Sequence, residues 1–287
     1  MRKISLILAL MLAALTARAQ VDLEKEFFSL PDTVTNGYLD SLSIEVAPPN
    51  DYWMVGVYGG ASVQFGFWNP TRLTRGHWAG PVYGASIIRY YTMFGIFHNM
   101  GLELGVQQNY EGYEFKFNKE TGYRATESGA YKVTMKVPEV YFASHFHVDV
   151  GEHFKLIAKL GMYGGYRQSI SRTLDDAYAA YEAYTQYQNS FRDYDRRWSY
   201  GVHGGVGFGV MLSPVEFHVN AQVKWGWSSF WKPDYASQYY YRFAYPLDGV
   251  ISFGVYYQLT PRYGHTRAQL RKLARKMVQE QNQKQND

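Results

Sequence analysis

Strict alternation of apolar and polar residues from 214 to 228 is the feature that most constrains the fold. The apolar positions are Val215, Phe217, Val219, Ala221, Val223, Trp225 and Trp227. The positions between them hold Glu216, His218, Asn220, Gln222, Lys224 and Ser228. Successive side chains of a β-strand point to opposite faces, so this strand has one apolar face and one charged face. Such a strand is typical of a wall with lipid outside and a polar lumen inside.

The same alternation recurs along the chain and predicts eight strands. They cover residues 52–67, 80–91, 98–108, 131–149, 154–167, 198–212, 214–228 and 250–259. Each of these spans is long enough to cross a bilayer at a tilt. We therefore expect an all-β fold, an eight-stranded antiparallel up-and-down transmembrane β-barrel. A soluble periplasmic β protein is the alternative.

The lengths of the connections test this count independently. The long connections lie near 68–79, 109–130, 168–197 and 229–248, and the short ones near 92–97, 151–152 and 213–214. Outer-membrane barrels alternate short periplasmic turns with longer extracellular loops, and this chain follows that alternation. An even number of strands then places both termini on the short-turn side, which predicts periplasmic termini.

The amino-terminal residues predict export. Arg2 and Lys3 precede an apolar run, and Ala17-Arg18-Ala19 supplies the small residues of a cleavage site. This pattern indicates a signal peptide over 1–19, because the apolar run is too short for a spanning helix. The expected organisation is the signal peptide 1–19, a periplasmic segment 20–50, a barrel 51–260 and a periplasmic tail 261–287.

Charge and composition argue against several classes of function. The formal charge is +4, but the signal peptide holds Arg2, Lys3 and Arg18 and no acidic residue, so the mature chain is near +1. Nucleic-acid binding therefore has no support. The chain has no Cys, which removes disulfides and thiolate metal sites. We expect no cofactor.

Three segments resemble the PorT-like family of outer-membrane β-barrels. They are Val137-Pro138-Glu139-Val140 continuing to His147, the glycine and aromatic run 159–166, and the glycine-rich run 198–207. The resemblance covers about residues 52–260. It implies a barrel whose relatives are typical of bacteria with type IX secretion, and the family's name-giving member is an accessory of that system. Membership alone does not assign that role.

The carboxyl-terminal tail departs from the family pattern. Thr266 stands three residues before Gln269, which is the spacing of a helix capping box. Leu270, Leu273 and Met277 then recur at helical spacing among basic residues. A short basic amphipathic helix that contacts a periplasmic or outer-membrane protein is one interpretation. A solvated, fraying tail is equally weighted, because short helices are marginal in water.

The same parity predicts a charged lumen. The residues assigned inward are Arg89, Glu103, Glu139, His145, His147, Asp149, Lys155, Lys159, Arg167, His203, Glu216, His218 and Lys224. An eight-stranded barrel leaves space that side chains fill, so opposite charges are expected to pair there. His145 and His147 could share a metal ion with Glu139, Asp149 or His203, but satisfied luminal histidines are the preferred reading and no metal site is predicted.

Hydrolytic chemistry is the competing class of function, as in barrel proteases or lipid A acyl-modifying enzymes. Such enzymes hold a nucleophile beside a base and an acid on the barrel rim. Ser86 and Ser144 are assigned to the lipid face, and no compact catalytic motif occurs in the sequence. We therefore predict a non-enzymatic protein without catalytic residues.

The loop 168–197 is the best candidate for a specific surface, because function on rigid scaffolds tends to lie in loops. Its tyrosines at 178, 181, 184 and 187, among Ala and Glu, suggest a helical excursion with a tyrosine stripe. Tyr178, Tyr181, Tyr184 and Tyr187 form a candidate partner surface, although packing over the barrel mouth is slightly preferred. The expected role is a structural or accessory subunit of an outer-membrane or secretion assembly that contacts lipid and protein partners; a passive anchoring or ligand-binding barrel is the alternative.

Overall fold

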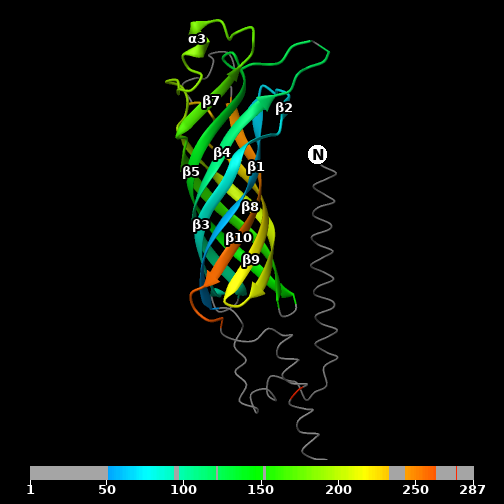
Figure 1. The fold of residues 1–287 in the computed structure, drawn as a ribbon, viewed down its shortest axis with the longest axis vertical. Coiled ribbons are helices and arrows are strands. Elements are labelled where there is room, and N and C mark those ends of the chain that lie inside the picture. Colours follow the sequence, from blue (N-terminus) through cyan, green and yellow to red (C-terminus); the bar gives the residue numbers. More distant parts are fainter. Residues whose placement is uncertain are drawn as a thin grey trace, which may run out of the picture. The chain divides into compact units, whose positions relative to one another are not determined.

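Eight long antiparallel strands form the wall of a barrel in the computed structural model, which describes residues 51–93, 97–120, 122–150, 153–232, 243–262 and 276 (Figure 1). These strands are β1 Tyr52–Asn69, β3 His77–Met93, β4 Phe97–Phe115, β5 Ala130–Val150, β6 Phe154–Tyr166, β8 Trp198–Leu212, β9 Val215–Gly226 and β10 Phe243–Gln258. The shorter β2 Thr74–Arg75 and β7 Ser169–Leu174 extend the sheet beside β4 and β5. A single helical turn, α3 Glu182–Thr185, lies between β7 and β8.

The ring closes between the first and last strands. Each long strand pairs with the next one along the chain, and β10 returns to pair with β1 from Met54↔Gln258 to Asn69↔Phe243. This continuous ladder leaves no open edge in the ring formed by the long strands. The predicted all-β, eight-stranded, antiparallel barrel is thereby confirmed.

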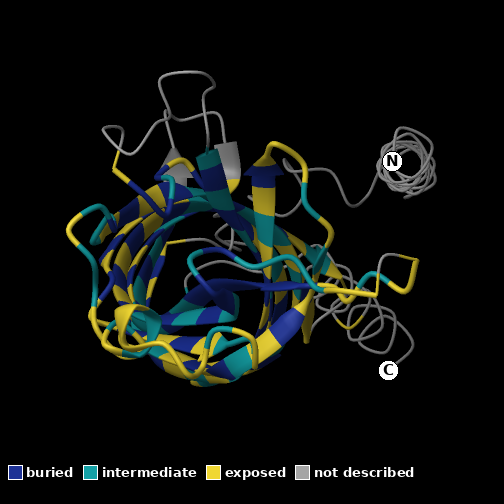
Figure 2. Cartoon of the chain, turned by 90° about the horizontal axis from the view of Figure 1, so that it is seen from above, coloured by how far each residue is buried: buried dark blue, intermediate teal, exposed yellow. Residues whose placement is uncertain are grey.

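Burial alternates along the strands as the sequence predicts. Figure 2 shows exposed and buried residues following one another around the wall. On β9 the side chain of Val219 is 48% exposed, whereas Glu216 and His218 have no exposed surface. Burial alternates in the same way along β1, β6 and β10, and the faces predicted for β9 are correct. An apolar outer face and a polar inner face are what a membrane barrel requires.

In one strand, β3, the inner and outer faces are the reverse of those that the sequence predicted. Ser86 of β3 is 4% exposed and faces the lumen, and Arg89 lies on the outer face, where it pairs with Asp51 and lies 5.0 Å from the centre of the Trp53 ring. The assignments of Ser86 to lipid and Arg89 to the lumen are therefore wrong. Ile87 and Ile88 are adjacent in this strand, so each face carries an apolar residue there. The alternation therefore could not decide which face points into the lumen.

The strands also run further than predicted at one end of the barrel. β4 continues to Phe115 and β10 begins at Phe243, so the connections after β4 and before β10 are shorter than the sequence suggested. The alternation of short and long connections is nevertheless retained. The start of β1 and the end of β10 both lie at the short-connection end, and the side of the membrane that this end faces remains a prediction.

Several predicted segments lie outside the described residues. These are the signal peptide 1–19, the segment 20–50, and most of the tail 261–287, including Leu270, Leu273 and Met277. Of that tail the structure describes Pro261, Arg262 and Lys276. Within the described part of the chain, no helix has the length and apolar character needed to cross a membrane.

Closure of the ring predicts heat-modifiable migration on detergent gels. The ladder between β1 and β10 ties the chain ends of the barrel together, so unfolding must break a whole strand pair at once. We expect the unheated protein to migrate as a compact species and the boiled protein to migrate at the position of the unfolded chain. A single band at the unfolded position in both samples would contradict a closed barrel.

Candidate functional site

The polar lumen is organised around buried carboxylates, and Glu103 on β4 lies in the first cluster. Its Oε2 accepts a hydrogen bond from Lys159 Nζ at 2.9 Å and also pairs with His145 Nε2. Its Oε1 accepts hydrogen bonds from Ser86 Oγ at 2.6 Å and from Tyr141 OH at 2.9 Å. Side chains from β3, β4, β5 and β6 thus meet at one carboxylate. These bonds offset the cost of removing its charge from water.

A second cluster surrounds Glu216 near the short-connection end. Glu216 forms an ion pair with Lys155, and both side chains are fully buried. Its Oε1 accepts hydrogen bonds from Tyr52 OH at 3.1 Å and Gln258 Nε2 at 2.8 Å, and its Oε2 lies 3.0 Å from His218 Nε2. This cluster joins the first and last strands of the ring to β6 and β9 from the inside.

A third cluster lies nearer the long connections. Lys224 Nζ donates to both oxygens of Glu139, at 2.5 and 2.7 Å, and lies 3.9 Å from Asp248 Oδ2. Gln107 Nε2 donates to Glu139 Oε2 at 2.7 Å, and Asn109 Nδ2 lies 3.4 Å from Asp248 Oδ2. The inward positions predicted for Glu103, Glu139, Lys155, Lys159, Glu216 and Lys224 are confirmed.

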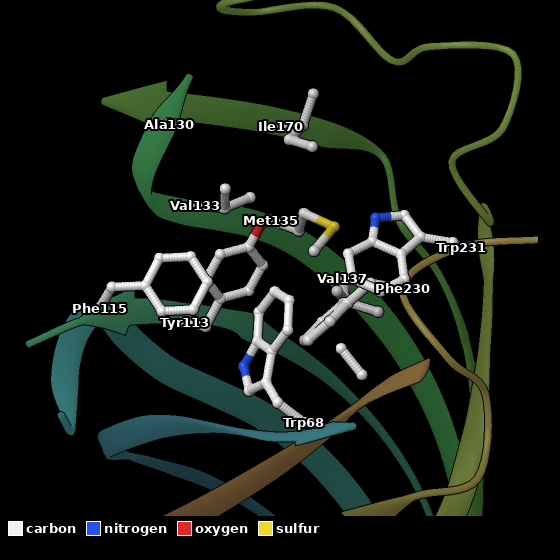
Figure 3. Packing of buried hydrophobic residues seen from close by; sticks show 11 residues of the cluster. Trp68, Tyr113, Phe115, Ala130, Val133, Met135, Val137, Ile170, Phe230 and Trp231 are labelled. Atoms are coloured by element: carbon white, nitrogen blue, oxygen red, sulfur yellow. The ribbon is translucent and has the colours of Figure 1, made fainter. Parts of the chain in front are cut away.

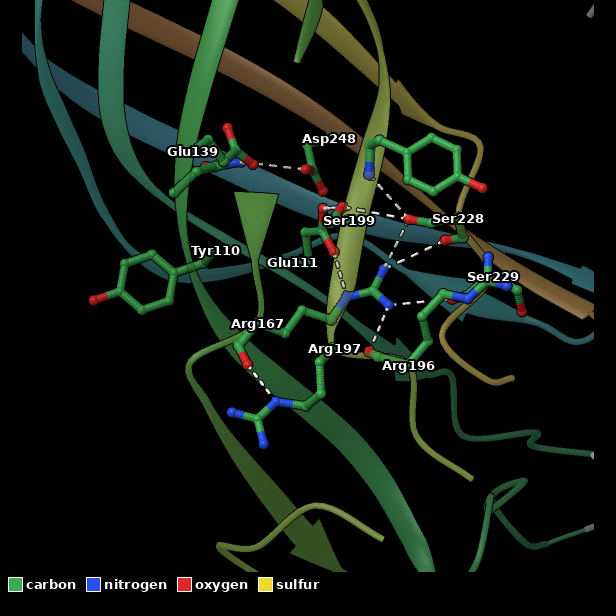
Figure 4. A network of polar contacts seen from close by, with 12 residues as sticks. Tyr110, Glu111, Glu139, Arg167, Arg196, Arg197, Ser199, Ser228, Ser229 and Asp248 are labelled. Atoms are coloured by element: carbon green, nitrogen blue, oxygen red, sulfur yellow. Dashed lines mark hydrogen bonds and ion pairs between the residues drawn. The ribbon is translucent and has the colours of Figure 1, made fainter. Parts of the chain in front are cut away.

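Arg167 forms a further polar layer in the lumen (Figure 4). Its Nε donates to Glu111 Oε2 at 2.9 Å, and Nη1 donates to the carbonyls of Arg196 at 3.0 Å and Ser229 at 3.1 Å. Glu111 also accepts a hydrogen bond from Ser199. Arg167 is fully buried, as predicted for the lumen, and it binds the backbone just before β8 and just after β9.

Above Arg167 the inner face becomes apolar and closes the barrel (Figure 3). The cap consists of Trp68, Tyr113, Phe115, Ala130, Val133, Met135, Val137, Ile170, Phe230, Trp231 and Ala244. The Trp68 ring lies 4.6 Å from the Tyr113 ring and 5.3 Å from the Trp231 ring, measured between centroids. A cavity of about 20 Å³ beside the cap holds one water molecule at most. The lumen is therefore filled at this end.

The tyrosines of the 168–197 loop do not form one helical stripe. Tyr178 and Tyr184 contact each other at 5.0 Å, and a Cβ atom on Gly129 would lie 2.7 Å from Tyr184 and 3.1 Å from Tyr178. Tyr187 packs under Arg192, and Tyr181 is 60% exposed. The predicted helix is reduced to the single turn α3, because contacts with the β4–β5 connection override local helix propensity.

Gly129 tests this packing between the two loops. Its φ of +79° disfavours other residues, and a side chain there would also displace the two tyrosines. We expect Gly129→Ala to cost about 1–2 kcal/mol locally and to raise proteolytic cleavage within 175–190 roughly tenfold. Gly122→Ala is the matched control, since its φ is +72° and its Cβ would meet no atom within 4 Å. Equal cleavage in both variants would contradict the contact.

The two histidines proposed as a metal pair have different surroundings. His145 binds the first carboxylate cluster, and its Nδ1 lies 3.4 Å from Tyr90 OH. Neither ring nitrogen of the buried His147 has a hydrogen-bond partner among the described residues, so the expectation that both are satisfied is not met. Asp149 is paired with Arg262. In the described ranges, no three His, Asp, Glu or Cys side chains are grouped to hold a metal.

The first cluster contains a serine, a histidine and a carboxylate, a grouping that the sequence did not predict because Ser86 was assigned outward. The Glu103 carboxylate lies between the Ser86 hydroxyl and the His145 ring. Nucleophilic serine needs the base bonded directly to its hydroxyl, with the acid behind the base. The order here is different, because the carboxylate lies between the hydroxyl and the ring, so the cluster does not have the geometry of a serine triad.

Comparisons with known proteins give one family match. A family model described as outer membrane protein beta-barrel domain matches residues 41–232, more than half of the chain. Solved structures similar to this chain include the outer membrane protein OprG from Pseudomonas aeruginosa, with 13% identity, 76% of this chain and 100% of that chain covered, and a TM-score of 0.42. No curated protein sequence matches the chain.

Two further solved structures are similar at lower scores. Neisserial surface protein A has 9% identity, with 71% of this chain and 96% of that chain covered and a TM-score of 0.39. The outer membrane protease OmpT from Escherichia coli has 9% identity, with 75% of this chain and 98% of that chain covered and a TM-score of 0.33.

Proposed function

This chain belongs to the outer membrane protein β-barrel domain family, and from that premise we propose that it is a non-enzymatic structural or accessory subunit of an outer-membrane assembly. The filled lumen carries this proposal. Three carboxylate clusters and the Arg167 layer occupy the inside of the barrel, and the apolar cap covers them. A lumen packed in this way favours neither a diffusion channel nor an internal active site.

The surfaces that remain for recognition are the loops and the chain ends. Tyr181 is an exposed aromatic side chain on a long connection, and aromatic residues are enriched where proteins bind one another. We propose that Tyr178, Tyr181, Tyr184 and Tyr187 belong to a partner surface, with Tyr181 making the direct contact. On the proposed periplasmic side, Leu270, Leu273 and Met277 would form a second contact through an amphipathic segment.

The more specific proposal is a PorT-like accessory of a secretion assembly, with type IX secretion as its setting. The support for it is the sequence resemblance over 137–147, 159–166 and 198–207, which now correspond to parts of β5, β6 and β8. In this arrangement both termini face the periplasm, and the long connections face the cell exterior. The membrane lipid and neighbouring outer-membrane or periplasmic proteins are the proposed partners.

The test is affinity purification of the full chain from outer membranes solubilised in mild detergent, with mass spectrometry of co-purifying proteins. Deleting residues 264–287 should leave a folded barrel, because the ladder between β1 and β10 ends before this segment, and should reduce recovery of a partner. Tyr181→Ser tests the loop, and Tyr123→Ser on the neighbouring connection is its control. Recovery of the barrel alone from the intact chain would overturn the accessory role.

A further inference from the structure

The lipid-facing wall carries a groove of about 650 Å³ across β3, β4, β5, β6 and β8. Its floor consists of Val106, Val140 and Gly164, which are neighbours in register on β4, β5 and β6. Aromatic residues border it, with Tyr83 on β3 at one side and Tyr166, Trp198 and Tyr200 at the other. The volume falls within the range of about 300–1,000 Å³ that is typical of small-molecule sites.

The depth of the groove comes from a missing side chain. Gly164 lies on the outer face, and a Cβ atom there would have no heavy atom within 4 Å. The outward residues before it on β6, Leu160 and Met162, are large and are 64% and 58% exposed. The wall therefore changes from bulky side chains to open space within one strand, next to Tyr200 on β8.

Two cations lie next to residues that line the long-connection end of this groove. Lys136 shares the outer face of β5 with Pro138, which lines the groove. Arg197 immediately precedes Trp198, and its guanidinium lies 4.8 Å from the centre of the Tyr166 ring. Figure 4 shows its side chain pointing away from that of Arg167, whose carbonyl accepts from Arg197 Nε at 2.8 Å.

Neither cation is neutralised by an acid in the part of the chain that the structure describes. The ion pairs there join other side chains, and Arg197 donates to the backbone carbonyls of Arg167 and Gln168 instead. A guanidinium with backbone partners keeps its positive charge available to an anion, and Arg and Lys both bind phosphate. An apolar groove that ends in two cations beside Trp and Tyr matches a lipid with an anionic head group.

We propose that the groove binds one phosphorylated glycolipid of the lipid A class, with an acyl chain over Gly164 and a phosphate between Lys136 and Arg197. The choice of an outer-leaflet lipid rests on the proposed orientation, which places the long connections outside the cell. The site itself rests on the groove and its two cations. It goes beyond the accessory role, because it defines a ligand for the barrel wall rather than a protein partner.

Native mass spectrometry of the full chain in mild detergent tests this site. The probes are bisphosphorylated lipid A, the same lipid without phosphates, phosphatidylglycerol, phosphatidylcholine and inorganic phosphate. We expect lipid A to bind at least tenfold more tightly than its dephosphorylated form or phosphatidylcholine. Binding of the phosphorylated and dephosphorylated lipids with equal affinity would overturn the role of the cations. Tighter binding of phosphatidylglycerol, or equal binding of inorganic phosphate, would overturn the assignment to lipid A.

Matched substitutions separate this site from general lipid contact. Gly164→Trp fills the groove and should weaken lipid A binding at least tenfold, whereas Gly249→Trp places the same side chain at an equally open position on β10. Equal affinities in these two variants would overturn the site. The double variant Lys136→Gln, Arg197→Gln should lose the preference for phosphate, with Lys232→Gln as its control. This charge test decides the proposal even if a tryptophan variant fails to fold.

Discussion

Replacing Arg167 with leucine is expected to lower the free energy of unfolding by about 3–5 kcal/mol. The guanidinium is fully buried and binds Glu111 and three backbone carbonyls, those of Arg196, Ser228 and Ser229. Its removal leaves the buried Glu111 carboxylate with Ser199 as its one hydrogen-bond donor among the described residues, and it leaves the three carbonyls without their cationic partner. Urea titration of the barrel in lipid vesicles, followed by tryptophan fluorescence, measures the loss.

The exposed pair of Arg89 and Asp51 provides the control. Its side chains are 34% and 57% exposed, so Arg89→Leu should change stability by about 0–1 kcal/mol. A double-mutant cycle with Glu111→Leu then isolates the buried pair, since removing both charges should cost less than the sum of the two single changes. If Arg167→Leu and Arg89→Leu lowered the free energy of unfolding by similar amounts, the Arg167 layer would not be desolvated.

Placing arginine on the lipid face should produce the second large effect. Val219 lies on the outer face of β9, away from the Trp residues near its end, and is 48% exposed. We expect Val219→Arg to cost about 2–4 kcal/mol, because a guanidinium near the middle of the bilayer loses its hydration. The same urea titration in vesicles measures this cost.

The control for Val219→Arg is the same side chain at the edge of the membrane. Leu212 also faces outward, is 53% exposed, and ends β8 beside the short connection to β9. Leu212→Arg should cost about 0–1 kcal/mol, because the guanidinium there reaches the interface. A cost at Leu212 as large as that at Val219 would contradict the placement of β9 across the bilayer.

The sequence predicted the faces of most strands because the period of two is a property of each strand alone. In β9 every second residue from Val215 to Trp225 is apolar, so only one face fits lipid. In β3 the adjacent pair Ile87 and Ile88 offers apolar residues to both faces, and neither parity is excluded. The parity chosen for this strand assigned Arg89 to the lumen, but its pairing partner Asp51 lies outside it.

The cap was missed for a related reason. Val133, Met135 and Val137 are apolar residues with inward parity, which is the reverse of the alternation that identified the membrane strands. The sequence predicted the strand 131–149 but not the apolar inner face at its start, and it predicted long loops where β4 and β10 continue as strands. Apolar side chains can point inward there because they cover the polar clusters and pack against Trp68, Phe230 and Trp231 from the other side of the mouth.

The loop tyrosines show how tertiary contacts change a local expectation. Their spacing predicted one helical stripe. Instead, Tyr178 and Tyr184 pack against Gly129 on another connection, and the Arg192 guanidinium lies over the Tyr187 ring. This leaves Tyr181 as the most exposed member of the candidate surface. The sequence of 168–197 cannot predict this contact, because the place of Gly129 in space depends on the connection between β4 and β5.

The sequence by itself determined the eight strands, the closed all-β fold and the inner or outer face of most residues, because alternation is set by local backbone geometry. Only the tertiary structure decided which charges meet. Glu103 binds Lys159 and His145, and Glu111 binds Arg167, because the register of neighbouring strands sets the depth of each side chain in the lumen. That register is fixed collectively when the ring closes, so no single strand encodes it.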